Sequence, residues 1–63
     1  TAMQFMLSAL GEDLRRPLDA GVMGAFNDAL REAQEMLERH PDCEAVEIFS
    51  EGEFVHDVAR KPN

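Results

Sequence analysis

Apolar residues recur with a helical period between Asp19 and Arg39, and this stretch limits the folds open to the chain. Steps of about 100° put the apolar side chains on one arc and the charged ones opposite. The apolar arc consists of Val22, Ala25, Phe26, Ala29, Leu30, Ala33, Met36 and Leu37. Such a helix needs a second apolar layer to cover, which the rest of the chain is expected to supply.

Both ends of this helix are predicted from local chemistry. Asp19 is predicted as the N-cap, because its side-chain oxygen can accept a hydrogen bond from the first free backbone N–H groups. Pro41 disfavours the α conformation at the residue before it, so the helix is expected to stop at His40.

Two runs after the helix, Ala45 to Phe49 and Phe54 to Val58, are rich in β-branched and aromatic residues and predict a β-hairpin. With Gly52 as the left-handed residue of a three-residue loop, Phe49 faces Glu53 and Ile48 faces Phe54. The core-facing side then holds Val46, Ile48, Phe54 and Val58. The opposite side holds Glu47, Phe49, Glu53, Val55 and Asp57.

The first eighteen residues fit two structures. As a hairpin, alternating residues from Met3 to Ala9 form one strand, the segment 11–13 turns the chain, and Leu14 to Leu18 forms the second strand. As a helix, Met3, Met6, Leu7 and Leu10 form an apolar stripe. We favour the hairpin, because the C-terminal hairpin otherwise has no partner strands.

The chain is therefore expected to be a single α+β domain over residues 1–63, with one amphipathic helix on a four-stranded antiparallel sheet. The element order is ββαββ and the spatial strand order 2-1-3-4. The alternative is an N-terminal helix, the long helix and a C-terminal hairpin. In the ββαββ fold the sheet face away from the helix stays uncovered and carries Met6, Phe49 and Val55 among acidic residues.

Small size makes self-association the expected source of additional stability. A 63-residue chain has a marginal core, and its single cysteine, Cys43, cannot form an internal disulfide. We therefore expect a homodimer. The lone thiol and the absence of a signal peptide or membrane-length apolar run indicate a cytoplasmic protein without a membrane segment.

The charge is strongly acidic and concentrated in the second hairpin. The net charge is −7, and the stretch from Pro41 to Ala59 contains no Lys or Arg. Its six carboxylates are Asp42, Glu44, Glu47, Glu51, Glu53 and Asp57. Direct nucleic-acid binding is not expected, because this charge repels phosphates and the chain has no Tyr or Trp. A second hypothesis is an acidic inhibitor that mimics nucleic acid and binds a basic partner protein.

Three side chains are weak candidates for metal ligands. His40, Cys43 and His56 are the soft-ligand candidates, and a His-x-x-Cys pair plus one His matches part of a zinc site. The structural interpretation is favoured, in which Cys43 is a small buried apolar side chain. A catalytic Cys43 is disfavoured because Asp42 and Glu44 flank it. We expect no enzyme activity and no cofactor.

The segment His40 to Val55 resembles small uncharacterised bacterial and phage proteins of ββαββ layout. It reads HPDCEAVEIFSEGEFV, with a Val-Glu-aliphatic-aromatic strand after a helix, a Gly turn and a second short strand. The resemblance covers about the last forty residues. It implies the same fold and no specific function.

The favoured functional expectation is a protein-protein interaction domain. The predicted interaction surface comprises Met6, Glu47, Phe49, Glu51, Glu53, Val55 and Asp57.

Overall fold

The computed structural model describes residues 3–13 and 15–60 and has the element order ββαββ, so the predicted α+β fold is confirmed and the N-terminal helix is excluded. The elements are β1 (Phe5–Leu10), β2 (Asp19–Met23), α1 (Phe26–Arg39), β3 (Ala45–Ser50) and β4 (Glu53–Ala59). None of the helical residues described forms a span long and apolar enough to cross a membrane.

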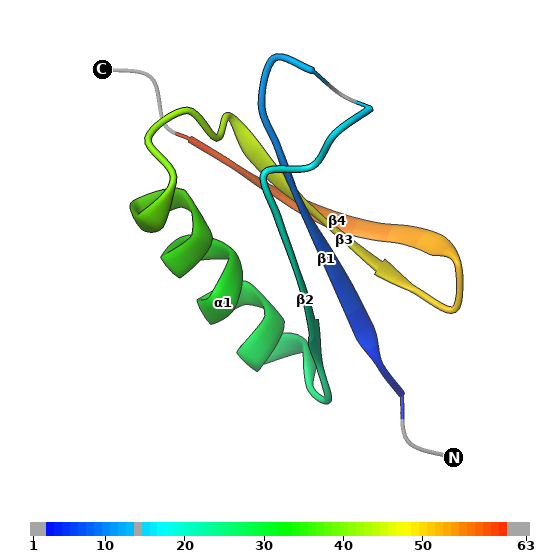
Figure 1. Ribbon diagram of the computed structural model, residues 1–63. Helices are drawn as coiled ribbons and strands as arrows, with labels where there is room; N and C mark the ends of the chain where they lie inside the picture. The colour runs from blue at the N-terminus through cyan, green and yellow to red at the C-terminus, as the bar shows by residue number, and fades with distance from the viewer. Residues whose placement is uncertain (1–2, 14, 61–63) are drawn as a thin grey trace.

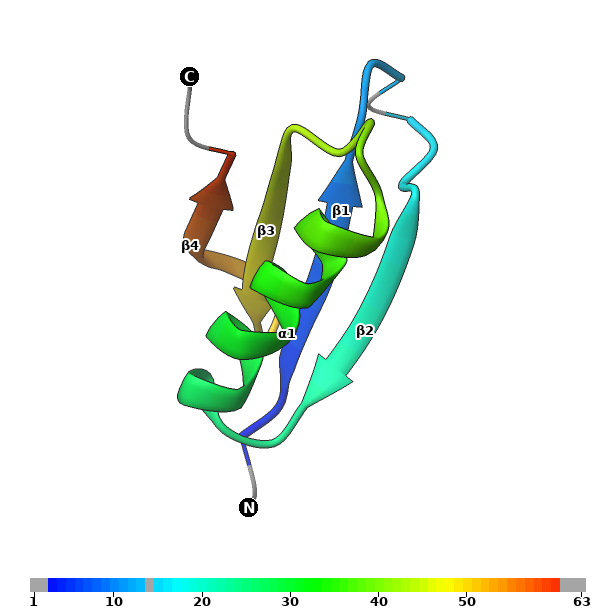
Figure 2. The same ribbon diagram turned by 90° about the vertical axis from the view of Figure 1, so that its left-hand side faces the viewer.

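The four strands form one antiparallel sheet in the order β2-β1-β3-β4, as the sequence predicts. Helix α1 lies across one face of this sheet, in front of the two central strands in Figure 2. Figure 1 shows the sheet nearly edge-on, with the helix on one side and no described helix or strand on the other. The described residues therefore form two layers and leave one sheet face uncovered.

The core lies between α1 and the sheet. Alternate residues of β1 and β3 point to the helix, because successive strand side chains alternate between faces. The buried apolar residues are Phe5, Leu7, Ala9, Ala29, Ala33, Met36, Leu37, Cys43, Val46 and Ile48. Gly21 lets the helix approach β2, since a Cβ built there would lie 3.1 Å from the terminal methyl of Met36.

The predicted second strand and helix start were wrong. The strand lies at Asp19–Met23, after the predicted Leu14–Leu18 segment, of which Leu14 is outside the described residues. The helix begins at Phe26, so Val22 belongs to the sheet, and Ala25 is an N-cap without a side-chain hydrogen bond. Pairing with β1 stabilises the strand at a segment where Gly21 and Gly24 weaken a helix.

The end of the helix follows the prediction. Arg39 is the last helical residue, and His40 is the C-cap with an extended backbone. Its N–H still donates to the carbonyl of Met36. This geometry agrees with the steric effect of Pro41 on the residue before it.

The second hairpin has a shorter loop than predicted. Ser50 pairs with Glu53 and Phe49 with Phe54, which leaves the two-residue loop Glu51–Gly52. Both loop residues have positive φ, 53° and 81°, as a type I′ turn requires. The prediction of a left-handed Gly52 was right, and the predicted three-residue loop and its pairings were wrong.

A β-bulge shifts the register of this hairpin between Ile48 and Phe49. Ile48 pairs with His56 while Phe49 pairs with Phe54, so Val55 is left without a partner in the ladder. Phe54 consequently shares the uncovered face with Phe49, and its predicted place in the core was wrong. His56 takes that helix-facing position and packs edge-on against Phe26, with ring centroids 5.9 Å apart.

Candidate functional site

The uncovered sheet face is organised in rows of paired residues that cross all four strands. One row is entirely apolar and runs from β2 to β4 through the residues Val22, Met6, Phe49 and Phe54. The next row changes from small to acidic, in the order Ala20, Ser8, Glu47 and Asp57. Side chains paired in this way lie on the same face, so each row is a continuous surface strip.

The apolar row is open to solvent. Met6 and Val22 are each 54% exposed and Phe54 is 55% exposed, while Phe49, between Met6 and Phe54, is half-buried. The rings of Phe49 and Phe54 meet edge to face, with centroids 5.9 Å apart. An apolar strip of this kind on a small protein is typical of a surface that a partner covers.

A shallow apolar hollow of about 380 Å³ interrupts this face. It extends from β2 across β1 to β3 and reaches the hairpin loop. Its lining is Met6, Leu7, Ser8, Ala20, Phe49 and Gly52. These residues carry no ionisable side chain, so the hollow suits an apolar side chain of a partner.

The acidic residues of the second hairpin are not gathered on this face. Glu47 and Asp57 pair directly across β3 and β4 on the uncovered side. Glu51 lies in the turn, and Glu53 pairs with Ser50, whose row belongs to the helix-facing side. The predicted position of Glu53 on the uncovered face was therefore wrong.

The structure does not bring the three metal-ligand candidates together. His40 caps the C-terminus of α1, while His56 contacts Phe26 at its N-terminus, about 20 Å away for a 14-residue helix. The Cys43 thiol is buried and lies 3.3 Å from the carbonyl oxygen of Ala45. Among the described residues, no three His, Cys, Asp or Glu side chains are grouped to hold a metal ion.

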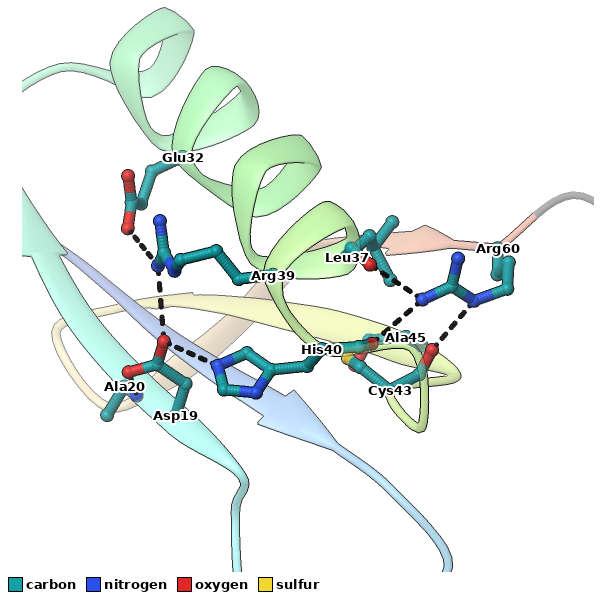
Figure 3. Close-up of polar contacts among 9 residues, drawn as sticks. All are labelled: Asp19, Ala20, Glu32, Leu37, Arg39, His40, Cys43, Ala45 and Arg60. Atoms are coloured by element: carbon teal, nitrogen blue, oxygen red, sulfur yellow. Dashed lines mark hydrogen bonds and ion pairs between the residues drawn. The ribbon is translucent and has the colours of Figure 1, made fainter.

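A polar cluster joins the C-terminal end of α1 to the first residue of β2 (Figure 3). The Asp19 carboxylate accepts hydrogen bonds from His40 Nε2 at 3.0 Å and Arg39 Nη2 at 3.1 Å. Arg39 Nη2 also lies 2.9 Å from Glu32. The pKa of Asp19 falls from 3.8 to about 2, because His40, then Arg39, then the N–H of Ala20 stabilise its ionised form. The cluster's contacts are all internal, which indicates a structural role.

Arg60 makes a second internal link between the end of β4 and the helix C-terminus (Figure 3). Its guanidinium donates to the carbonyl oxygens of Leu37, His40 and Cys43 at 2.7, 2.9 and 3.0 Å. The last carbonyls of a helix have no intrahelical partner, so a cation here satisfies them. Arg60 is thereby occupied by the fold.

A larger hollow of about 600 Å³ lies beside Arg60, between the segment after β1 and the segment before β3. Its charged lining residues are Glu12, Asp13, Asp42, Glu44 and Arg60. The guanidinium already donates to the three carbonyls, so this hollow does not present a free cation to an anionic ligand.

Sequence reasoning missed two members of the apolar row. The helical period places Val22 in the helix and a three-residue loop places Phe54 in the core, and the structure differs at both boundaries. The signal for Phe54 is the Glu-Gly pair, which fits a two-residue turn as well as a longer one.

Comparisons with protein-family models, curated proteins and solved structures found no significant match.

Proposed function

We propose that this protein is a non-enzymatic protein-protein interaction domain that works as a homodimer through its uncovered sheet face. The observation that carries the proposal is the exposed apolar row of Val22, Met6, Phe49 and Phe54. A two-layer fold with one helix leaves this row to be covered by another molecule.

The small core supports the same proposal. Among the described residues the core has ten buried apolar side chains. Three are alanines and one is Cys43, and these four small side chains contribute little buried area. Chains near this size commonly gain stability by oligomerisation when they have no disulfide or structural metal. A second copy of the chain is the partner that is always present at equal concentration.

Sedimentation velocity from about 1 to about 100 µM tests the homodimer, because mass action populates it as concentration rises. We expect a dimer for the wild type and a monomer for Met6→Lys, which places a charge in the apolar row. Gln34→Lys is the matched control, since Gln34 is exposed on the helix. A wild-type protein that stays monomeric over this range contradicts the proposal.

A second candidate is a basic protein partner, favoured by the direct pairing of Glu47 with Asp57. Like charges opposite each other in a sheet destabilise it, and a Lys or Arg from a partner would relieve this repulsion. Titration with a lysine-rich peptide tests the candidate. Affinity lost in the double variant Glu47→Gln, Asp57→Asn supports it, and unchanged affinity argues against it.

A further inference from the structure

We propose that the two copies pack their uncovered sheet faces together about a two-fold axis. The axis lies midway between the two sheets, runs parallel to the strands, and passes over the line between β1 and β3. This inference rests on the proposed homodimer and specifies its geometry. The axis places β4 of one copy over β2 of the other, and β3 over β1. Each row of the uncovered face then lies against the same row of the second copy, in reverse order.

The apolar row is self-complementary under this operation. Its β2 and β1 half is aliphatic and its β3 and β4 half is aromatic. Reversal places Phe54 against Val22 of the second copy and Phe49 against its Met6. The hollow of about 380 Å³ is lined by residues of β2, β1 and β3, and Met6, which faces the ring of Phe49 of the second copy, is one of them. Rings therefore lie against aliphatic side chains instead of meeting other rings.

The next two rows are complementary in the same sense. Glu47 faces Ser8 of the second copy, whose hydroxyl can donate to the carboxylate, and Asp57 faces its Ala20. Beyond them Leu10 is paired with Ala45, so a large side chain faces a small one after reversal. The acidic pairs of the two copies consequently do not oppose each other.

An axis perpendicular to the strands gives a poorer interface. It keeps each strand over its own copy, so Phe54 would lie against Phe54 and the aliphatic halves would meet each other. That arrangement sets ring against ring and aliphatic against aliphatic side chains, so large side chains do not face smaller ones. The difference in side-chain size across the row thus selects the axis parallel to the strands.

The available area is sufficient for a stable dimer. A standard interface removes about 800 Å² from each partner. This is about one-sixth of the 4684 Å² accessible surface of the molecule. One face of a two-layer protein supplies that fraction, and two sheets packed in this way form a sandwich with a typical spacing of about 10 Å.

Cross-linking tests the axis. Val22→Cys and Phe54→Cys proteins are mixed, allowed to exchange subunits and treated with a short bismaleimide. We expect the mixed cross-linked dimer to predominate, because the two positions face each other. In either homodimer the same positions lie three strand spacings apart, about 14 Å laterally. The wild type is the control, since its single thiol, Cys43, is buried.

A pair of oppositely charged variants provides a second test of the axis, which needs no cross-linker. Val22→Lys and Phe54→Glu should each dimerise at least tenfold more weakly than the wild type. Mixing the two should restore a heterodimer, in which the introduced ammonium of one chain meets the introduced carboxylate of the other and the second contact remains native. Sedimentation of single and mixed samples measures this recovery.

The outcomes separate the two proposals. Phe54→Cys protein that cross-links to itself as efficiently as to Val22→Cys protein overturns the parallel axis. So does a dimer for which mixing the oppositely charged variants gives no recovery. A wild type without any dimer overturns the proposed function itself, and with it this inference.

Discussion

Individual side chains near the helix C-terminus hold the two layers together. Asp19 and Arg60 come from strand ends far apart in the sequence, and both bind the last turn of α1 or the residue after it. Arg39 connects Asp19 to Glu32, and hydrogen bonds with these carboxylates, first Glu32 and then Asp19, raise the pKa of Arg39. These contacts connect the C-terminal end of the helix to both edge strands of the sheet.

The Asp19 carboxylate should make stability depend on acid pH. Its pKa is about 2 in the folded protein and near 3.8 when unfolded, so the unfolded chain binds more protons between these values. The contribution is present above about pH 4 and is lost as the pH falls toward 2. Urea unfolding at several pH values should show this loss in the wild type and a smaller one in Asp19→Asn. Asp42→Asn, at an exposed carboxylate outside the cluster, should keep the wild-type slope.

At the scale of elements, the sequence predicts those with a strong period and misplaces those bounded by glycine or alanine. The helix end and the strand at Ala45–Ser50 match because Pro41 and β-branched residues define them. The helix start does not, because Val22 and Ala25 fit the apolar arc although they lie outside the helix. Pairing with β1 decides the conformation of this segment, and periodicity cannot detect it. The predicted faces of Glu53 and Phe54 are wrong for a related reason: the loop is one residue shorter than predicted, which reverses the alternation. The β4 bulge restores the alternation, so Asp57 and Val58 lie on their predicted faces.

The helix start lacks a capping side chain, so a substitution that supplies one should stabilise the protein. Ala25 is exposed and has the extended backbone of an N-cap, with no oxygen to accept from the first helical N–H groups. Ala25→Thr should raise the free energy of unfolding by about 1 kcal/mol. Ala25→Val is the isosteric control without the hydroxyl, and urea unfolding compares the two. Equal stability of the two variants would contradict the capping explanation.

The hairpin turn also contains a residue whose backbone conformation lowers the stability of the protein. Glu51 has φ of 53°, in the left-handed region that costs a residue with a Cβ about 1 kcal/mol. Asn tolerates this region, and Asn-Gly is the preferred type I′ pair. Glu51→Asn should therefore stabilise the protein by roughly 0.5 to 1 kcal/mol in urea unfolding. Glu51→Gln removes the charge and keeps the backbone cost. If it gives the same gain, electrostatic repulsion rather than backbone conformation is the cause.

At the scale of the whole molecule, folding and association should be coupled. The fold has one core layer and exposes its second apolar surface, so covering that surface adds stability that the monomer lacks. Thermal unfolding should therefore depend on protein concentration. A hundredfold rise adds about 2.7 kcal/mol per dimer and should raise the melting temperature by several degrees. Gln34→Lys should keep this dependence and Met6→Lys should abolish it, with circular dichroism as the measurement. A melting temperature independent of concentration in the wild type would mean that the uncovered face does not contribute to stability through a second copy.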